Sequence, residues 1–316
     1  MEFKIENYNL LQGLMRACNL AAIESYKLMG KSDEKGADFL AVKAMREALN
    51  SMDIDGKIAI GEGERDEAPM LFIGEKLGSG LGPKIDIAVD PLEGTTILAT
   101  GGFGAMSVIA ATDRGGFLEA PDTYMHKIAT GFNFPEQIID LDLSIKENLT
   151  ALAKAQKKDL DQLVVIVLDR PRHKELIAKI REENARVKLI SDGDISAIIQ
   201  TTYMGRADLY VGIGGAPEGV LSAAALQTLG GQMCARLIIR NEEEKAKTLK
   251  MNITDLDKKY YLNDLASGDV VFAATGVTDG ELLKGVRYKK NIIKTYSLLM
   301  SARQKTVQMI KTKTLI

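Results

Sequence analysis

Apolar residues recur at helical spacing in the first fifty residues of the chain. Over 9–29 they include Leu11, Leu14 and Cys18, and a second periodic run covers 38–50. Gly30 follows the first run directly, at the place where glycine commonly ends a helix. The pattern therefore predicts two consecutive helices.

The pattern then changes to short apolar runs that are typical of strands. Pro91 follows one of these runs and is expected to end it, because proline has no N–H for a sheet. We predict strands at 57–60, 84–90, 104–112 and 127–131, and a helix at 67–77.

The second half of the sequence alternates between strand and helix patterns. This order favours βαβ units and a parallel sheet. Residues 241–268 are polar and weakly periodic, which indicates a surface excursion with no assigned chemistry. The predicted strands are 164–168, 187–190, 207–211, 270–274 and 291–300, and the helices are 172–183, 194–203 and 217–229.

The chain has 316 residues, which is long for one hydrophobic core. The lysine-rich stretch 145–162 is a candidate boundary. We expect an α/β protein with two intimately packed halves, an α+β half at 1–155 and an α/β half at 156–316.

The composition limits which ligands and metals the protein is expected to bind. The net charge of −2 gives no overall field that would hold nucleic acid or an anionic membrane. With two histidines and two separated cysteines, a zinc site and a disulfide framework are both disfavoured, so a metal would be a hard ion on carboxylates. The N-terminus has no signal-peptide pattern and no stretch is apolar enough to span a membrane, so we expect a cytoplasmic protein.

Acidic residues follow several predicted strands. Asp90 and Glu93 flank a proline turn in DPLEGT, and two close carboxylates favour a cation between them. Glu62 stands between two glycines after another strand, and Glu218 lies in the glycine-rich crossing GIGGAPEG. Asp38 opens a predicted helix. Each has an ordinary alternative as a turn or helix-start residue. The metal hypothesis depends on the convergence of the other four acids, without Asp38, at the carboxyl ends of strands.

Basic and polar groups follow other strands. Arg170 and Arg172 flank Pro171, and arginine matches phosphate oxygens in a bidentate manner. Asp192 and Asp194 could accept hydrogen bonds from sugar hydroxyls or cap the next helix. The arginines could equally form a solvated helix start.

These segments resemble one family, the class II fructose-1,6-bisphosphatases. The matching blocks run in family order over nearly the whole chain, and they are IAIGEGERDEAPMLFIGEKLG, IDIAVDPLEGT, APDTYMHK, RPRH, DGD and YVGIGGAPEGV. The family belongs to the lithium-sensitive, metal-dependent sugar and inositol phosphatases that share the DPxxGT core. The resemblance implies a layered αβαβα sandwich and hydrolysis of the 1-phosphate of fructose 1,6-bisphosphate in gluconeogenesis, with Mn²⁺ or Mg²⁺.

The resemblance also implies roles for individual residues. Asp38 and Glu62 would hold one metal, and Asp90, Glu93 and Glu218 another, which places most metal ligands in the half at 1–155. Thr95, Asp66 and Glu62 would be catalytic, with Thr95 and Asp66 orienting the attacking water and relaying its proton. The implied substrate contacts are Glu93, Gly94, Thr95, Tyr124, Arg170, Pro171, Arg172, Asp192, Gly193, Asp194 and Gly215.

One position departs from the family. Where relatives often have lysine before the first metal acid, this chain has Glu34, and Lys35 follows. The change could lower activity or shift metal preference, or Lys35 could take over the role. It also keeps a sugar-phosphate sensor open as a second class of function.

The exact substrate and the assembly are less narrowly defined by the sequence. Sedoheptulose 1,7-bisphosphate or inositol phosphates are possible substrates beside or instead of fructose 1,6-bisphosphate. A Rossmann dehydrogenase is disfavoured, because no strand is followed by GxGxxG with an acid about 20 residues on. We expect a homo-oligomer, a dimer or tetramer.

Overall fold

The chain divides into two compact units. A computed structural model describes residues 8–63, 69–132 and 134–315. Unit 1 comprises residues 1–119 together with 267–316, and unit 2 comprises 120–266. The expected boundary at 155/156 differs from this division, because it falls inside a helix of unit 2, and because the end of the chain returns to unit 1.

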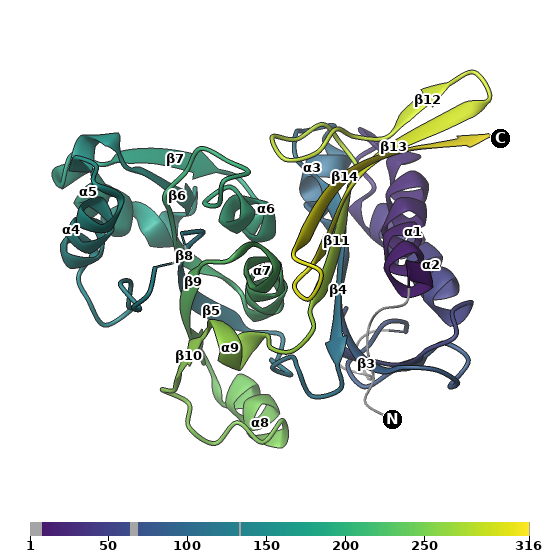
Figure 1. Cartoon of the computed structure of the whole chain (residues 1–316), viewed down its shortest axis with the longest axis horizontal. Coiled ribbons are helices and arrows are strands. Elements are labelled where there is room, and N and C mark those ends of the chain that lie inside the picture. The colour runs from purple at the N-terminus through teal and green to yellow at the C-terminus, as the bar shows by residue number, and fades with distance from the viewer. Residues whose placement is uncertain (1–7, 64–68, 133, 316) are drawn as a thin grey trace. The chain divides into compact units, whose positions relative to one another are not determined.

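Unit 1 contains a sheet whose strand order is β12-β13-β11-β4-β3-β1-β2, with β14 paired to β13. Most neighbours are antiparallel, and β1 and β3 are parallel. Figure 1 shows α1 and α2 covering one face of this sheet. The elements are α1 (Tyr8–Tyr26), α2 (Glu34–Asn50), α3 (Thr95–Ala99), β1 (Asp55–Ile60), β2 (Lys76–Leu77), β3 (Lys84–Glu93), β4 (Met106–Asp113), β11 (Val271–Gly276), β12 (Arg287–Lys289), β13 (Ile292–Ser301) and β14 (Thr306–Leu315).

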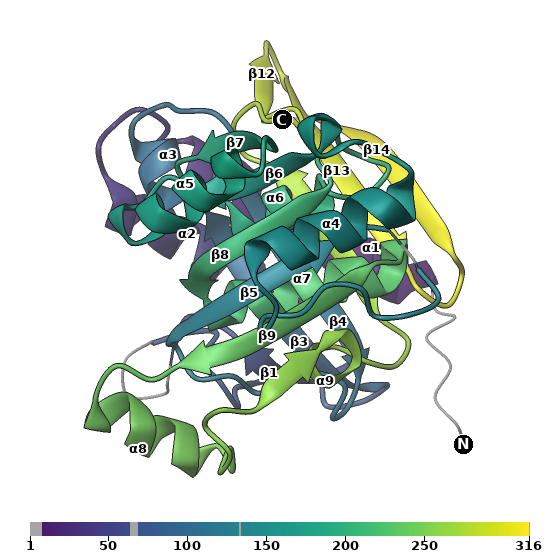
Figure 2. The same ribbon diagram turned by 90° about the vertical axis from the view of Figure 1, so that its left-hand side faces the viewer.

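Unit 2 contains a sheet whose strand order is β10-β9-β5-β8-β6-β7. In Figure 1, α4 and α5 lie on one face of this sheet and α6 and α7 on the other, and Figure 2 shows α4 crossing in front of β5 and β8. The elements are β5 (Tyr124–Thr130), α4 (Ile145–Gln156), η1 (Leu160–Gln162), β6 (Val164–Leu168), η2 (Pro171–His173), α5 (Lys174–Glu182), β7 (Arg186–Ile190), α6 (Asp194–Ile199), β8 (Leu209–Gly215), α7 (Ala216–Leu229), β9 (Gln232–Ile238), α8 (Glu242–Lys250), β10 (Lys259–Tyr261) and α9 (Leu262–Leu265).

The predicted α/β class is confirmed. Unit 1 has helices α1 and α2 on one face of its sheet, and unit 2 has helices on both faces of its sheet. The periodic residues predicted for the first two helices are buried in one apolar cluster with the unit 1 sheet. A second apolar cluster lies between α4, α5 and the unit 2 sheet.

Several predicted elements differ from the structure. The described part of 67–77 is turns followed by β2, because Pro69 and Gly74, at φ +88°, interrupt the periodic pattern. β3 continues past Pro91 to Glu93, and the stretch 145–162 contains α4. The polar segment 241–268 contains α8, β10 and α9.

The parallel sheet is only partly as predicted. β6 is parallel to both β7 and β8, as the alternation indicated. β5, β9 and β10 join the same sheet in antiparallel pairs. No described helix combines the length and the apolar character that a membrane crossing requires.

Candidate functional site

Two of the predicted acids flank an irregularity in β3. Asp90 pairs with Val108 of β4 and Glu93 pairs with Met106, and the register shifts between the two pairs. Pro91 lies inside this bulge, where no ladder N–H is needed. The backbone amide of Leu92 donates to Asp90 Oδ1 at 3.2 Å. The bulge thus holds two carboxylates at the end of the strand, with Glu93 only 4% exposed.

Gly94 and Thr95 follow the bulge directly. Gly94 has a φ of +85°, a left-handed conformation that favours glycine, and it is the N-cap of α3. Thr95 is the first residue of α3 and is half-buried. The turn therefore starts a helix within two residues of Glu93.

Glu62 lies at the same edge of the unit 1 sheet. β1 and β3 are parallel, with Ile60 paired to Ala88. Glu62 comes two residues after Ile60, and Asp90 comes two residues after Ala88. The amide of Glu62 donates to the Leu71 carbonyl at 3.0 Å. Asp66, the predicted partner of Thr95, lies outside the described residues.

Gly61 allows this loop to pack closely. A Cβ at Gly61 would lie 1.9 Å from the Leu71 carbonyl oxygen, so only glycine fits beside that backbone. Glu75, 6% exposed, secures the opposite side of the loop by accepting from Arg46 Nε at 2.6 Å and from the Leu71 amide. The position of Glu62 thus depends on a fixed backbone pairing.

Asp38 lies one turn inside α2, since the helix begins at Glu34 and is capped by Asp33. The loop before α2 is bonded to α3, through Gly30 N to Leu98 O at 2.9 Å and Ser32 N to Ala99 O at 3.0 Å. Asp38 is half-buried, and burial raises the pKa of its carboxyl group. The start of α2 is thereby attached to the helix that follows the β3 bulge.

The donor chemistry of unit 1 suits a hard divalent ion, because its predicted ligands are all carboxylates. Across residues 8–63, 69–132 and 134–315, no three His, Cys, Asp or Glu side chains gather into a ready-made metal cluster. The assignment of Asp38, Glu62, Asp90 and Glu93 as ligands therefore stays a prediction.

The predicted residues of unit 2 converge on one edge of its sheet. β7, β6 and β8 are adjacent and parallel, so the segments that follow them, 192–194, 170–172 and 215–218, emerge at the same edge. β5 runs antiparallel to β8 and begins at this edge, with Tyr124 opposite Gly215. The topology therefore brings these segments to one edge of the unit 2 sheet, and their role as substrate contacts stays a prediction.

The arginine segment is fixed to the neighbouring strand. Arg172 donates from Nε and Nη2 to the Ile213 carbonyl at 3.1 and 2.7 Å. Pro171 begins the 3₁₀ turn η2. Arg170 is half-buried. Burial raises the pKa of the Asp192 carboxyl group, and the positive charge of Arg170 partly offsets this increase. Both arginines thus lie at the edge where the acids of 192–194 emerge.

His173 is a residue that sequence reasoning missed. It is 1% exposed, and its Nδ1 is 2.8 Å from the Leu168 carbonyl. Its Nε2 accepts from the Ile213 amide at 2.8 Å. These two bonds require a neutral ring with the proton on Nδ1, and burial lowers its pKa accordingly. His173 joins β6 to β8 beneath the arginine segment, and its place directly after RPR was the available signal.

Tyr124 is stacked by two guanidinium groups. The Arg172 Cζ lies 4.9 Å from the ring centroid and the Arg240 Cζ lies 4.5 Å from it. Arg240 donates from Nε to Glu244 Oε1 at 2.8 Å, and Thr123 Oγ1 donates to Glu244 Oε2 at 3.0 Å. Arg240 was missed because it adjoins the segment 241–268, to which the sequence assigned no chemistry.

Asp192 and Asp194 flank a left-handed glycine. Gly193 has a φ of +95°, and its amide donates to Asp192 Oδ1 at 3.0 Å. Asp194 begins α6, is 5% exposed and forms an ion pair with Lys127. Lys127 was also missed by the sequence analysis.

Glu218 lies in the first turn of α7, which Gly215 caps. A Cβ at Gly215 would lie 1.9 Å from Glu218 Oε2, so glycine lets this carboxylate fold back against the turn. The Oε2 atom is buried and has no hydrogen-bond partner among the described residues, and burial raises the pKa of Glu218. A buried carboxylate oxygen of this kind fits a cation as its partner.

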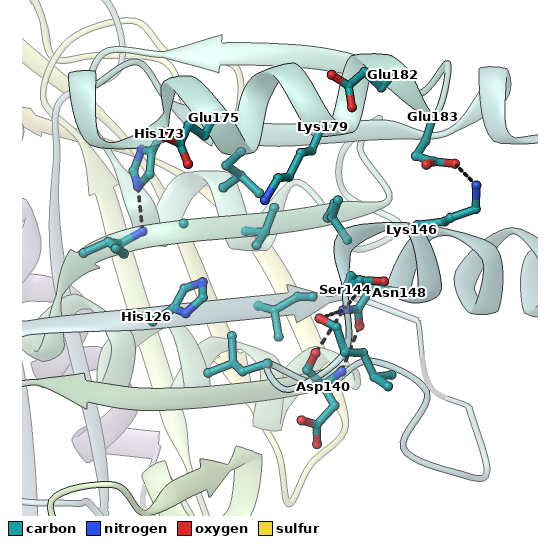
Figure 3. A pocket seen from close by; sticks show the side chains of 18 of the residues that line it. His126, Asp140, Ser144, Lys146, Asn148, His173, Glu175, Lys179, Glu182 and Glu183 are labelled. Atoms are coloured by element: carbon teal, nitrogen blue, oxygen red, sulfur yellow. Dashed lines mark hydrogen bonds and ion pairs between the residues drawn. The ribbon is translucent and has the colours of Figure 1, made fainter.

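A cavity of about 600 Å³ lies on the α4/α5 side of the unit 2 sheet (Figure 3). Its lining includes His126 of β5, Lys179 of α5 and Arg172. Several lining charges are paired within unit 2, such as Lys146 with Glu183 at 3.3 Å. His126 lines this cavity and has no assigned role.

Comparison with known proteins identifies relatives over nearly the full chain. A protein from Trichodesmium erythraeum named D-fructose 1,6-bisphosphatase class 2/sedoheptulose 1,7-bisphosphatase is 45% identical over 92% of both chains. A protein of the same name from Prochlorococcus marinus (strain MIT 9312) is 44% identical over 97% of this chain and 96% of its own.

One solved structure has a weak similarity to this chain. An inositol monophosphatase from Anabaena shares 14% identity, covers 64% of this chain and 73% of its own, and has a TM-score of 0.34, which is too low to carry an argument.

A sequence profile of one family matches the chain from residue 8 to residue 314. This span includes every predicted site residue from Asp38 to Glu218. The chain therefore belongs to the family described as bacterial fructose-1,6-bisphosphatase, glpX-encoded.

Proposed function

We propose that this protein hydrolyses the 1-phosphate of fructose 1,6-bisphosphate to give fructose 6-phosphate and phosphate. The observation that carries the proposal is the pair of carboxylates in the β3 bulge, Asp90 and Glu93, followed at once by Gly94 and Thr95. Membership of the glpX-encoded family supports the choice of substrate.

The carboxylates are proposed as ligands of divalent ions, Mn²⁺ or Mg²⁺. Asp38 and Glu62 would hold one ion, and Asp90, Glu93 and Glu218 another. The buried, unpartnered Oε2 of Glu218 supports this assignment in unit 2. When bound, such ions would stabilise the charge of the transferring phosphoryl group and lower the pKa of the attacking water.

The remaining site residues act on water and sugar. The Thr95 hydroxyl would orient the attacking water and relay its proton to Asp66, and Glu62 would assist. Glu93, Gly94 and Thr95 would also contact the reacting end of the substrate.

The sugar and its second phosphate are assigned to unit 2. The guanidinium groups of Arg170 and Arg172, set by Pro171, suit the phosphate that does not react. Tyr124, whose ring contacts two guanidinium groups, would add its hydroxyl. The same edge of the sheet also carries groups that would exchange hydrogen bonds with the sugar hydroxyls, as acceptors or as donors. These residues are Asp192, Gly193, Asp194 and Gly215.

Glu34 modifies this proposal without removing it. Glu34 and Asp38 are four residues apart in α2 and therefore share a helix face. The acid at this position adds negative charge beside a proposed ligand, where relatives often have lysine. Lys35, also exposed in the first turn of α2, remains available to the phosphate.

Sedoheptulose 1,7-bisphosphate is the second candidate substrate. Relatives carry both activities in their names, and the two sugars differ little near the reacting phosphate. Initial rates on both bisphosphates and on inositol 1-phosphate, each with Mn²⁺, test the proposal. We expect turnover of fructose 1,6-bisphosphate and slow or no turnover of inositol 1-phosphate; a preference for inositol 1-phosphate would reject the assignment.

A further inference from the structure

A lysine inside unit 2 connects two of the proposed substrate segments. Lys127 of β5 has no exposed surface. Its neighbours His126 and Ile128 line the cavity on the α4/α5 side (Figure 3). Because side chains alternate along a strand, Lys127 points to the opposite face, toward α6 and α7. A fully buried lysine is rare and requires partners.

Its partners come from two different strand ends. The ammonium group is paired with Asp194 Oδ2, at the start of α6, and donates to the Gly215 carbonyl at 2.9 Å, at the cap of α7. Asp194 is itself 5% exposed. One cation therefore fixes the segments after β7 and β8 relative to β5.

The backbone is shaped to allow this contact. A Cβ at Gly214 would lie 2.0 Å from Asp194 Oδ2 and 3.0 Å from Lys127 Nζ. Glycine at this position therefore leaves the space in which the ion pair forms. Lys127 thus holds Asp194 Oδ2 against Gly214 and fixes the orientation of the whole carboxylate.

Stability alone is a poor explanation for the pair. A buried ion pair commonly contributes less to stability than well-packed apolar residues of the same volume, because both charges lose their hydration. The chain offers a comparison at the other end of β8, where Lys158 Nζ bonds to Asp208 Oδ1 at 2.5 Å. Lys158 is 37% exposed and keeps part of its hydration, whereas Lys127 keeps none.

We propose that Lys127 is a positioning residue of the sugar site, which holds the Asp194 carboxylate and the Gly215 carbonyl so that Asp194 accepts a hydrogen bond from a sugar hydroxyl. The inference rests on the proposed function, because it takes Asp194 as a contact of the sugar. Lys127 itself touches neither substrate nor reacting atoms.

The test is a double-mutant cycle of Lys127→Met, Asp194→Asn and both together, with Lys158→Met as the matched control. Lys127→Met raises KM for fructose 1,6-bisphosphate, and the calorimetric Kd for fructose 6-phosphate, by about 10-fold or more, because a charge-assisted contact to the sugar loses its geometry. It changes kcat by less than about 3-fold, because the sugar contact is made in ground and transition states alike. Lys158→Met lowers thermal stability and leaves KM and Kd unchanged.

The cycle separates positioning from packing. Added to Asp194→Asn, Lys127→Met has no further effect on KM or Kd, because its action passes through that carboxylate. The double variant also removes both buried charges, so it stays measurable if Lys127→Met alone does not fold. Additive effects, or a Lys127→Met enzyme with unchanged KM and Kd, would overturn the proposal.

The two proposals fail differently. A wild-type protein that binds fructose 6-phosphate and releases no phosphate with any metal contradicts the proposed function, and the Kd values still decide the role of Lys127. A wild-type protein that binds no sugar phosphate refutes both.

Discussion

At Asp90 a negative charge can be removed with little change of side-chain shape. Its carboxylate lies in the β3 bulge and accepts from the Leu92 amide, which an asparagine oxygen can also satisfy. We therefore expect Asp90→Asn to reduce kcat with Mn²⁺ by at least about 100-fold, since a proposed ligand loses its charge. The thermal melting temperature should change by only a few degrees.

The control for Asp90 comes from the same pair of strands. Asp113 ends β4 and pairs with Ile85 at the far end of the β3–β4 ladder. Asp113→Asn should leave kcat unchanged. Full activity in Asp90→Asn would contradict the metal assignment of this residue.

The buried neutral ring of His173 should make the stability of the fold depend on pH. The neutral ring accepts a hydrogen bond from the Ile213 amide at Nε2. Protonation would place an N–H at Nε2 facing the Ile213 N–H, and this hydrogen bond would be lost. Burial lowers the folded-state pKa below the ordinary value of about 6.5, so the unfolded chain binds more protons between the two values. Stability is therefore complete above pH 6.5 and is lost as the pH falls from there toward the lowered pKa.

Thermal melts of His173→Gln test this account. The variant should melt lower than the wild type at pH 7.5, with a smaller loss of melting temperature between pH 7 and pH 5. His126, whose pKa is also lowered, is removed in a parallel His126→Gln series so that its contribution can be subtracted. Identical pH slopes in the wild type and His173→Gln would show that the ring does not carry the effect.

At the scale of elements, the tight turn from β8 into α7 positions two carboxylates, because the two glycines that end β8 leave space for them. A Cβ at Gly215 would strike Glu218 Oε2, and one at Gly214 would strike Asp194 Oδ2. Gly215 has a φ of −64°, which alanine adopts freely, so its substitution displaces a flexible carboxylate and not the backbone. The same turn therefore offers two substitutions with different targets.

We expect Gly215→Ala to weaken Mn²⁺ binding, measured by EPR titration, by about 10–100-fold. Gly214→Ala should instead raise KM for the sugar bisphosphate and change Mn²⁺ affinity less, because it displaces Asp194. The two variants act as controls for each other. Equal effects of both on Mn²⁺ affinity would contradict the separation of metal and sugar residues in this turn.

Element boundaries show where sequence patterns were sufficient. The apolar period predicted α1 and α2, and the alternation predicted the parallel order of β6, β7 and β8. The predicted end of β3, before Pro91, was wrong because a bulge accommodates this proline inside the strand. The apolar pattern gives no sign of such a bulge. The described part of 67–77 keeps a helix-like apolar spacing, but Pro69 and Gly74 give it turns.

At the scale of the molecule, the chain order conceals the division into units. Residues 267–316 return to unit 1, where β11 pairs with β4 at a sequence separation that no local pattern reveals. A boundary drawn from the lysine-rich stretch 145–162 therefore fell inside α4. Most of the candidate acids and both arginines could be selected from the sequence because they follow predicted strands. The buried contacts of Lys127 and His173 are displayed only by the folded chain.

The central claim is that the protein removes one phosphate from fructose 1,6-bisphosphate and requires a divalent ion to do so. The most direct measurement is ³¹P NMR of the sugar during incubation with the protein and Mn²⁺, Mg²⁺ or EDTA. The account predicts that the 1-phosphate signal disappears with metal, that one equivalent of phosphate forms, that the 6-phosphate remains, and that EDTA stops the reaction. No release with either metal from folded protein, or release that EDTA leaves unchanged, would contradict it.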